Sequence, residues 1–528
     1  MSIGKKNKVV DIQTAINAIK DGSTIATGGF VSTAIPEYIY IEMANKYQET
    51  QHPKDLTLVY AAGQGDGKDR GLNHLSAAGL VTKIIGGHYG LVPKLGERVI
   101  NNEIQGYNLP QGVISHMFRN IASKKPLIIS KVGLGTFVDP DFGGGKLNAI
   151  TTKDIVSKVQ VDGEDYLSYR TFPIDVAILR GTVADPDGNI SLKKEALTTE
   201  SMAIAMAAHN SGGIVIVQVE MIVQNGSLNP REVVIPGILV DYVVIVDNQE
   251  EHHSQTFATQ YNPSFSGESR VPLSAIKPLA FDERKIIARR AAFELRPNQV
   301  VNLGIGMPEG VSKVASEEGL LNSVTLTTEP GAIGGVPAGG MDFGAADNPE
   351  AVIDQPSQFD FYDGGGLDIT FLGLAQVDEE GNLNVSKFGP KLAGAGGFIN
   401  ISQNAKKVVF VGTFTAVGLK TAIENGQLKI TQEGKQCKFV KQVEHRTFSG
   451  RVAYKNRSEV LYITERCVFK IVEQGIELVE IAPGIDLERD ILAHMEFKPQ
   501  INPDLKLMDS SIFVDKPMDL LHKIPEFS

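Results

Sequence analysis

The sequence predicts a protein of two similar α/β domains, each built on an open and mainly parallel β-sheet. Three observations support this fold class: the length of 528 residues, the alternation of apolar runs with helical patterns, and a set of sequence blocks that occurs twice. A chain of this length exceeds the size at which a single hydrophobic core stops growing, so at least two domains are expected. With 42% hydrophobic and 21% charged residues, the composition is that of a folded globular protein.

Six apolar, β-branched runs are interpreted as buried parallel strands. They are continuous rather than alternating, as expected for strands that are covered on both faces. The runs comprise residues 56–60, 127–129, 214–219, 242–246, 324–328 and 408–411. Residues 281–296 have the pattern of an amphipathic helix that ends before Pro297. Its four basic residues are interpreted as a solvated or snorkelling face: Arg284, Lys285, Arg289 and Arg290.

A polar segment near the midpoint of the chain is predicted to link the two domains. Residues 248–270 contain no Ile, Leu, Val or Met, which is typical of a linker. The prediction is an N-terminal domain at 1–247, a linker at 248–277 and a C-terminal domain at 278–528. The pair His252 and His253 lies in this polar segment and is expected to be solvated.

The two predicted domains share sequence blocks, which indicates a duplication. Residues 175–190 and 368–383 match at a constant offset of 193, including two Asp residues and a Gly-Asn pair. Residues 24–29 resemble 300–306, and residues 236–241 resemble 483–488. Three matching blocks favour a duplicated fold. A duplication of this kind suggests an active site between the domains, because clefts between domains commonly bind ligands.

Charge and cysteine content exclude several classes of protein. The net charge of −11 argues against a general binder of nucleic acid or of anionic membranes, yet a local basic pocket for a small anion remains compatible with it. Two cysteines, Cys437 and Cys467, are too few for a disulfide framework or a structural zinc site, and no metal site is expected. There is no run of 18 apolar residues and no apolar region after the basic N-terminus. We expect a cytoplasmic protein.

One carboxylate stands out among glycine-rich loops. Between Gly331 and Gly397, 15 of 67 residues are glycine, a local enrichment typical of loops that approach a ligand closely. Glu329 follows the run "VTLTT" and precedes Pro330-Gly331, which predicts a position at the carboxyl end of a strand. Open α/β sheets bind their ligands at that edge. The alternative is a solvated carboxylate at the start of a loop. A dinucleotide fingerprint is disfavoured, because "GIGMPEG" lacks a correctly spaced third glycine.

The ordered motifs resemble those of family I CoA-transferases. The second half carries "NLGIGMPEG", "TTEPGAIGG" and "KLAGAGGF", and the first half carries "ATGGF", "YNLPQGVISH" and "GLGTFVDP". The resemblance extends from about residue 10 to about residue 515. It is closest to the single-chain branch that transfers CoA among short-chain acids, the acetate and propionate CoA-transferases. A site formed by both halves fits this resemblance.

The resemblance implies a covalent mechanism centred on Glu329. In this family a glutamate in a Ser-Glu-Asn-Gly-like motif is the nucleophile, and this chain has Thr328-Glu329-Pro330-Gly331 in that place. Pro330 replaces the Asn of the motif, which removes the Asn side chain and that backbone N–H. The implied activity is a ping-pong acyl-CoA:carboxylate CoA-transferase with a glutamyl-CoA thioester intermediate.

The remaining site residues follow from the same resemblance. Backbone N–H groups of Gly28-Gly29 or Gly396-Gly397 are expected to stabilise the oxyanion, and Gln111 is expected to hold the carboxylate of the acid. The predicted CoA-binding residues are Gly304, Ile305, Gly306, Met307, Lys391, Gly394, Gly396 and Gly397. No tightly bound cofactor is expected, because CoA is itself the carried group.

Two alternatives remain open at the level of sequence. An acyl-CoA hydrolase on the same scaffold would let water intercept the intermediate, and a non-catalytic sensor would bind an acyl-CoA without forming an adduct. The expected partners are acyl-CoA and small carboxylic acids, with neither nucleic acid nor membrane. The family resemblance also implies a homo-oligomer.

Overall fold

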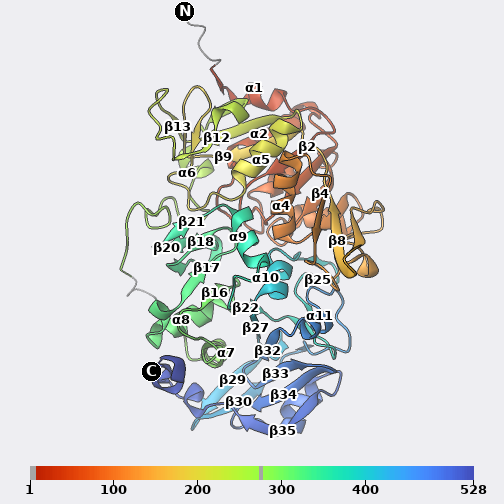
Figure 1. Ribbon diagram of the computed structural model, residues 1–528, viewed down its shortest axis with the longest axis vertical. Coiled ribbons are helices and arrows are strands. Elements are labelled where there is room, and N and C mark those ends of the chain that lie inside the picture. The colour runs from red at the N-terminus through yellow and green to blue at the C-terminus, as the bar shows by residue number, and fades with distance from the viewer. Residues whose placement is uncertain (1–6, 273–277, 528) are drawn as a thin grey trace, which may run out of the picture. The chain divides into compact units, whose positions relative to one another are not determined.

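The computed structural model describes residues 7–272 and 278–527 and forms two compact α/β units (Figure 1). Unit 1 comprises Met1–Val271, Thr328–Asp360 and Gly389–Asn400, and unit 2 comprises Pro272–Thr327, Phe361–Phe388 and Ile401–Ser528. Two segments from the C-terminal half of the sequence, 328–360 and 389–400, therefore pack with the N-terminal half. The division of the sequence into domains at 1–247 and 278–528 remains a prediction.

Unit 1 is built on a parallel sheet with the strand order β1-β15-β12-β9-β2-β3-β4-β5. All neighbouring strands in this sheet run parallel. Their bounds are β1 Val9–Val10, β2 Thr24–Thr27, β3 Leu56–Tyr60, β4 Val81–Gly86, β5 Gln105–Asn108, β9 Val176–Arg180, β12 Ile214–Val219 and β15 Tyr242–Ile245. The helices of unit 1 are α1 Ile12–Asn17, α2 Glu37–Thr50, α3 Pro93–Ile100, α4 Gln111–Ala122, α5 Ser201–Asn210 and α6 Gln249–His252.

Alternate residues of these strands pack into two different cores. In β9, Ala177 and Leu179 join the core beneath α4 and α5, whereas Ile178 joins the core beneath α1, α2 and α3. In β3, Val59 faces the first core and Leu58 the second. Because helices cover both faces, every position of such a strand favours an apolar residue. This explains the continuous apolar runs of the sequence.

Two smaller sheets with mainly antiparallel pairing complete unit 1, and β13 pairs parallel with β10 in the first of them. One has the order β13-β10-β11-β14 and another the order β6-β8-β7. Strand β6 corresponds to the run at 127–129, and its interpretation as a buried parallel strand is wrong: it pairs antiparallel with β8, and Leu127 and Ile129 are exposed. The bounds are β6 Leu127–Ser130, β7 Val156–Val161, β8 Glu164–Arg170, β10 Val183–Ala184, β11 Ile190–Ser191, β13 Met221–Ile222, β14 Val233–Ile235, β18 Ala332–Ile333, β19 Val336–Pro337, β20 Ala346–Asp347, β21 Ala351–Val352 and β26 Lys391–Leu392. Helices α9 Gln355–Asp363 and α10 Phe398–Asn404 begin in unit 1.

Unit 2 contains parallel strands in the order β17-β16-β22-β27-β32, continued by β33, β34 and β35. Strands β32, β33 and β34 pair antiparallel, and β35 is parallel to β34. The bounds are β16 Val300–Leu303, β17 Thr325–Thr327, β22 Ile369–Gly373, β23 Gln376–Val377, β24 Leu383–Asn384, β25 Lys387–Phe388, β27 Lys407–Val411, β28 Thr415–Ala416, β29 Lys420–Glu424, β30 Gln427–Gln432, β31 Gln436–Cys437, β32 Glu459–Ile463, β33 Cys467–Val472, β34 Gly475–Ile481 and β35 Gln500–Leu507. Its helices are α7 Glu283–Ala292, α8 Glu309–Glu317, α11 Gly450–Lys455 and α12 Leu520–Lys523.

Equivalent hydrogen bonds in the two units confirm the duplication. The backbone N–H of Thr24 in β2 donates to Asp175 at 2.8 Å, and that of Val300 in β16 donates to Asp368 at 2.8 Å. The hairpins β10-β11 and β23-β24 also correspond at the offset of 193, and each turn has an Asp that accepts from an Asn four residues later. The third block is not part of the repeat, because residues 236–241 precede β15 whereas residues 483–488 follow β34.

Both sheets place a glycine loop at a topological switch point. In unit 1 the strand order reverses at β2, which lies between β3 and β9, and Gly28 and Gly29 follow β2. In unit 2 the order reverses at β16, which lies between β17 and β22, and Gly304 follows β16. Crevices at the carboxyl ends of strands beside such a reversal are where open α/β sheets bind ligands.

The basic face predicted on residues 281–296 is mostly buried. Helix α7 is shorter than expected: it begins after Asp282, whose side chain caps it, and ends at Ala292. Lys285, Arg289 and Arg290 are buried and only Arg284 is exposed, so the interpretation as a solvated face is wrong for three of the four. The buried charges are tolerated because each has partners. Lys285 pairs with Glu317, Arg290 pairs with Glu294 and Glu480, and Arg289 donates to backbone carbonyls of Ser511 and Lys516.

The described part of the polar linker packs against unit 1. Thr256, Ser264 and Phe265 are buried, and Arg180 at the end of β9 donates to the carbonyl of Ser254 at 2.8 Å. His253 is buried as well, so the expectation of a solvated histidine is wrong for it. Burial holds the pKa of His253 well below its usual value. Hydrogen bonds and the packing of Phe257 and Phe265 hold this segment, although it contains no Ile, Leu, Val or Met, and that composition is why the sequence suggested a free linker.

Candidate active site

Glu329 projects from a tight turn directly after strand β17. The backbone N–H of Gly331 donates to the carbonyl of Thr328 at 3.1 Å and closes the turn around Glu329. The N–H of Thr328 donates to the carbonyl of Ala332 at 2.9 Å, and the side chain of Gln358 in α9 donates to Thr328 O at 2.9 Å. Glu329 therefore follows the end of a strand, as the sequence predicts, and the turn that presents it is held from both sides.

The carboxyl group of Glu329 lies against the backbone of Gly397. A Cβ placed on Gly397 would lie 2.3 Å from Glu329 Oε2 and 3.0 Å from its Cδ, so only glycine fits there. Glu329 is partly exposed as a residue, yet burial raises the pKa of its carboxyl group to about 7, opposed by the hydrogen bond from the Gly397 N–H. Desolvation thus raises the pKa of this carboxyl group, and one backbone N–H donor lowers it by less.

The loop that carries Gly397 is tied to the end of strand β4. Gly394 forms an antiparallel bridge with His88, and the N–H of Tyr89 donates to Ala393 O at 2.7 Å. The N–H of Gly396 donates to Gly87 O at 2.7 Å. At Gly394, which has φ +82°, a Cβ would lie 2.9 Å from the Cα of His88. The glycines at 394, 396 and 397 therefore permit close backbone approach, as the sequence predicts.

Gln111 lies beside the same loop. It is the first residue of α4, and its backbone N–H donates to Gly396 O at 3.0 Å. Its side chain is buried, and Gln111 Nε2 has no hydrogen-bond partner. A Cβ on Gly396 would lie 3.6 Å from Gln111 Oε1. Leaving a buried amide without a hydrogen-bond partner costs folding free energy. The unpaired Gln111 amide beside the 394–397 loop therefore indicates a place for a ligand.

The other predicted residues lie on other loops of unit 1 or in unit 2. A Cβ on Gly28 would meet Leu179 and Thr199, and a Cβ on Gly29 would meet Ile35 and Gln64. Lys391 is exposed on β26. In unit 2, Gly304 donates to Phe371 O at 2.9 Å, Ile305 is 53% exposed, Gly306 donates to Glu309 at 2.8 Å, and Met307 is half-buried.

Several polar residues of this region were not identified from the sequence. Asn400 is fully buried and accepts from the N–H of Gly112 at 3.1 Å, and Gln355 donates to Ser115 at 2.8 Å and to Glu200 at 3.3 Å. Burial raises the pKa of Glu200 to about 8. These residues stand singly in helical or loop sequence. The only available signal was the pair Gln355 and Gln358, which share a face of α9 at a spacing of three.

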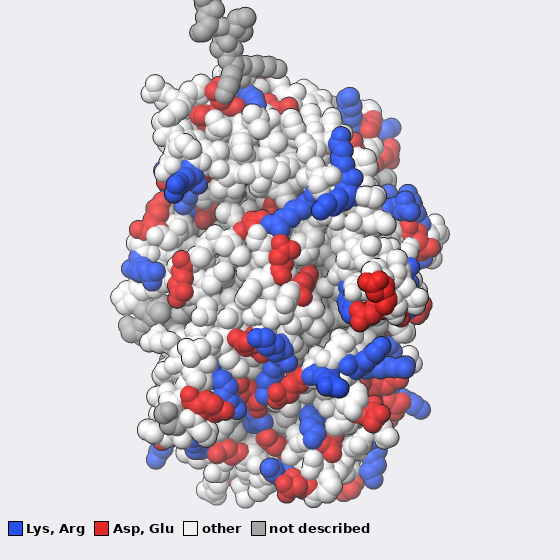
Figure 2. Space-filling view, in the orientation of Figure 1, with Lys and Arg blue, Asp and Glu red and all other residues white. Residues whose placement is uncertain are grey.

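The described residues were compared with two further kinds of site, a metal centre and a basic surface. No group of three His, Cys, Asp or Glu side chains could hold a metal ion within residues 7–272 and 278–527. On the face shown in Figure 2, Lys and Arg are interspersed with Asp and Glu in the lower part, and a short stripe of basic side chains lies in the upper part. None of the helices in the described ranges combines the length and apolar composition of a membrane span.

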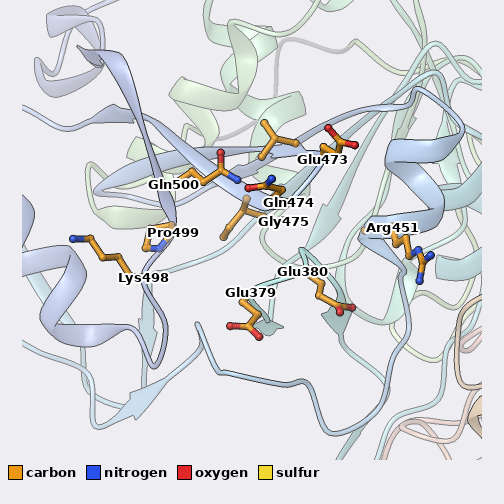
Figure 3. A pocket seen from close by; sticks show the side chains of 12 residues that line it. Glu379, Glu380, Arg451, Glu473, Gln474, Gly475, Lys498, Pro499 and Gln500 are labelled. Carbon is orange, nitrogen blue, oxygen red and sulfur yellow. The ribbon is translucent and has the colours of Figure 1, made fainter.

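A surface pocket of about 470 Å³ in unit 2 does not fit the predicted chemistry (Figure 3). Its wall contains Glu379, Glu380 and Glu473 against Arg451 and Lys498, and it includes none of the predicted site residues. A ligand with several phosphate charges would be repelled by three carboxylates. The cluster around Glu329 is therefore the better candidate.

Comparisons with known proteins point to one family. The model of the coenzyme A transferase family matches residues 9–245. The chain is 48% identical to a caffeate CoA-transferase of Acetobacterium woodii over 514 residues, covering 96% of this chain and 98% of that protein. It is 42% identical to the acetate CoA-transferase YdiF of Escherichia coli K12 over 522 residues, covering 98% and 97%.

Solved structures agree with this similarity. The apoenzyme of the acyl-CoA transferase YdiF from Escherichia coli O157:H7 superimposes with a TM-score of 0.92 at 42% identity, covering 98% of each chain. A thioester complex of the same protein with CoA gives a TM-score of 0.90 at 42% identity, covering 97% of each chain. The two-unit α/β fold with mainly parallel sheets is thus shared along nearly the whole length.

Proposed function

The chain belongs to the coenzyme A transferase family, and from this premise we propose that it transfers CoA between short-chain acids through a glutamyl-CoA thioester on Glu329. Relatives of 48% and 42% identity over nearly the whole chain make it a CoA-transferase. The acid specificity and the covalent intermediate are the proposed part. The observation that carries the proposal is the enclosed Glu329 carboxyl group in contact with the Gly397 backbone N–H.

The proposed reaction exchanges one acyl bond at a time. The Glu329 carboxylate attacks the carbonyl carbon of an acyl-CoA, and the C–S bond breaks to give a mixed anhydride and CoA thiolate. The thiolate then attacks the glutamyl carbonyl and releases the first acid, leaving a thioester between Glu329 and CoA. A second carboxylate attacks this thioester and repeats the steps in reverse. No proton, electron or further reactant is required.

The Gly397 N–H is placed to stabilise the oxyanion that each step forms. It already donates to the Glu329 carboxyl group, so it can remain on the same oxygen when the glutamyl carbon becomes tetrahedral. We favour the 396–397 pair over Gly28-Gly29 for this role, because the Gly397 N–H donates to the Glu329 carboxyl group. Gln111 is proposed to hold the acid, with its unpaired amide as the donor.

CoA itself is proposed to lie along glycine loops of the C-terminal half of the sequence. The proposed contacts are Gly304, Ile305, Gly306, Met307, Lys391, Gly394 and Gly396, as substrate-binding residues rather than cofactor ligands. The thioester complex of YdiF with CoA supports a covalent CoA adduct in a protein of the same fold. Acetate is the proposed acceptor, because the chain is 42% identical to the acetate CoA-transferase YdiF. We also propose that the protein is a cytoplasmic homo-oligomer. The two cysteines, Cys437 and Cys467, are both free thiols.

The intermediate is tested by mass and by kinetics. Mixing the enzyme with acetyl-CoA is expected to add the mass of CoA to the chain, and peptide mapping is expected to place it on Glu329. Initial rates plotted in double-reciprocal form against acid and acyl-CoA are expected to give parallel lines, because the first acid leaves before the second enters. Intersecting lines without any adduct would contradict the proposal, and release of CoA without an acceptor acid would favour a hydrolase.

The raised pKa of Glu329 predicts a pH dependence of adduct formation. Burial raises this pKa from 4.5 to about 7, and only the ionised carboxylate is a nucleophile. The rate constant for CoA incorporation should therefore rise with pH through about 7 and level off above it, with a loss of about tenfold one pH unit below the midpoint. Stopped reactions between pH 5.5 and 8.5 measure it by mass. Glu200→Gln should retain the midpoint, and a rate independent of pH across this range would refute the assignment.

A further inference from the structure

We propose that His88 is a second acid-binding residue: its imidazole and the Gln111 amide together hold the carboxylate of the acceptor acid over Gly396 through neutral N–H donors. This inference rests on the proposed function, since the acid is the acceptor of that reaction. It adds a specificity-determining group in a segment, residues 86–90, that the sequence motifs did not mark.

The backbone of His88 is part of the framework of the site. His88 follows strand β4 and bridges to Gly394, and the next two residues, Tyr89 and Gly90, both donate to Ala393 O at 2.7 and 2.9 Å. The loop held in this way continues directly to Gly396 and Gly397. The imidazole is thereby placed at the loop whose end contacts Glu329.

Three glycines surround the imidazole ring. A Cβ on Gly63 would lie 2.6 Å from His88 Nδ1, a Cβ on Gly90 would lie 3.0 Å from Cε1, and a Cβ on Gly396 would lie 3.7 Å from Cδ2. The first two distances are shorter than van der Waals contact, so a side chain at Gly63 or Gly90 would displace the ring. The glycines at 63, 90 and 396 thus leave space for the imidazole with Nδ1 toward Gly63 and Cδ2 toward Gly396.

The ring is neutral, and its proton is assigned to Nε2. Burial lowers the pKa of His88 to about 4, so the cationic form is not populated at neutral pH. Nδ1 is buried with no hydrogen-bond partner. Because an orphaned N–H is rarer in proteins than an acceptor with an unused lone pair, Nδ1 is the unprotonated nitrogen. His88 is partly exposed, and Nε2–H is the donor left for a ligand.

His88 and Gln111 flank the same point of the loop. The Cβ position of Gly396 is 3.7 Å from His88 Cδ2, which is bonded to Nε2, and 3.6 Å from Gln111 Oε1, which shares its amide with the unpaired Nε2. A small group lying over Gly396 can therefore reach both side chains. A carboxylate has two acceptor oxygens and can take one donor on each. Two unpaired donors at one glycine match this ligand.

Neutral donors suit an acid that must also react. The bound carboxylate has to attack the thioester at Glu329, and a cationic partner would stabilise its ground state and weaken it as a nucleophile. Two uncharged N–H groups orient the acid while leaving its charge available. The same argument applies to Glu329, whose only pKa-lowering contact is the Gly397 N–H.

The test isolates the step in which the acid enters. Parent enzyme, His88→Leu and His88→Gln are loaded with acetyl-CoA, freed of excess ligand, and mixed with increasing acetate while loss of the CoA mass is followed. His88→Leu removes the donor and should raise the half-saturating acetate concentration about tenfold, the equivalent of one hydrogen bond. His88→Gln restores a neutral N–H and should recover most of that loss. Cleavage by hydroxylamine, which has no carboxylate, should proceed equally in all three.

Contrary results are distinct from those that would refute the intermediate. An acetate half-saturation in His88→Leu within twofold of the parent overturns the inference. Equal slowing of acetate and hydroxylamine cleavage in both variants also overturns it, because it shows a packing role for the ring. If the parent takes up no CoA mass, the proposed intermediate fails instead. In that case the KM for acetate is measured in the overall transfer of CoA from propionyl-CoA. A KM about tenfold higher in His88→Leu than in the parent would then support the role of His88.

Discussion

Replacing Glu329 by Gln is expected to leave a folded enzyme that binds acyl-CoA but incorporates no CoA. Glutamine is close in size and keeps the contact with Gly397, but an amide does not attack an acyl-CoA carbonyl. The turn around residue 329 is formed by backbone bonds and by Gln358, none of which uses the Glu329 carboxyl group. Intact mass after incubation with acetyl-CoA measures the effect. Covalent CoA on Glu329→Gln would show that the nucleophile lies elsewhere.

The charge-preserving change Glu329→Asp separates chemistry from charge. It shortens the side chain by one methylene, about 1.5 Å, and withdraws the carboxylate from the Gly397 N–H. Near-attack geometry tolerates little displacement, so the rate of adduct formation should fall about a hundredfold. Glu49→Asp is a matched control on an exposed glutamate of helix α2, outside the proposed site. If Glu329→Asp has the parent rate, the carboxylate acts at a distance and is not the attacking group.

Gly397→Val is expected to have the next largest effect. Its Cβ would lie 2.3 Å from Glu329 Oε2 and 3.2 Å from Phe359, so the side chain would move the nucleophile and the N–H that serves it. Loss of an oxyanion donor costs about a hundredfold or more in kcat. Gly397 does not adopt a positive φ, so the effect is one of space and not of backbone strain.

The control for Gly397 is a glycine with free space. Gly373 has no atom within 4 Å of its Cβ position and no positive φ, so Gly373→Ala should behave like the parent. Steady-state kcat and the single-turnover rate of CoA incorporation are measured on all three proteins, with circular dichroism as the check on folding. A folded Gly397→Val with parent-like turnover would remove this loop from the site.

The fold was predictable from sequence wherever both faces of a strand are buried. The runs at 56–60 and 214–219 match β3 and β12 residue for residue, because helices on both sides leave no polar face. The run at 127–129 is equally apolar, yet it belongs to an antiparallel sheet with exposed Leu127 and Ile129. Apolar composition alone does not report how many faces are covered. The buried cations of α7 were misjudged for a similar reason, since partners such as Glu480 lie far away in sequence.

The candidate site was predictable only where local sequence determines it. Glu329 stood out at a strand end followed by Pro-Gly, the resemblance to CoA-transferases gave it its predicted role, and the structure has that turn. His88 had no such signal, because its place beside Gly396 arises from pairing between residues that are about three hundred positions apart. The same applies to Asn400, which bonds to Gly112. Spacing rules describe neighbours along the chain, and these contacts are made by the tertiary fold.

The pairing of residues 88–90 with 393–394 has a consequence for biosynthesis. The bond from Tyr89 N to Ala393 O closes a loop of chain that includes strands of both units. During translation the N-terminal segment emerges first. The residues that follow β4 cannot form their hydrogen bonds with the loop at 393–397 until that loop has been synthesised. Contacts of such long range form late and slowly, because the entropy of closing a long loop is lost before they stabilise the fold. The proposed acid-binding and oxyanion groups therefore do not come together until three quarters of the polypeptide has been made.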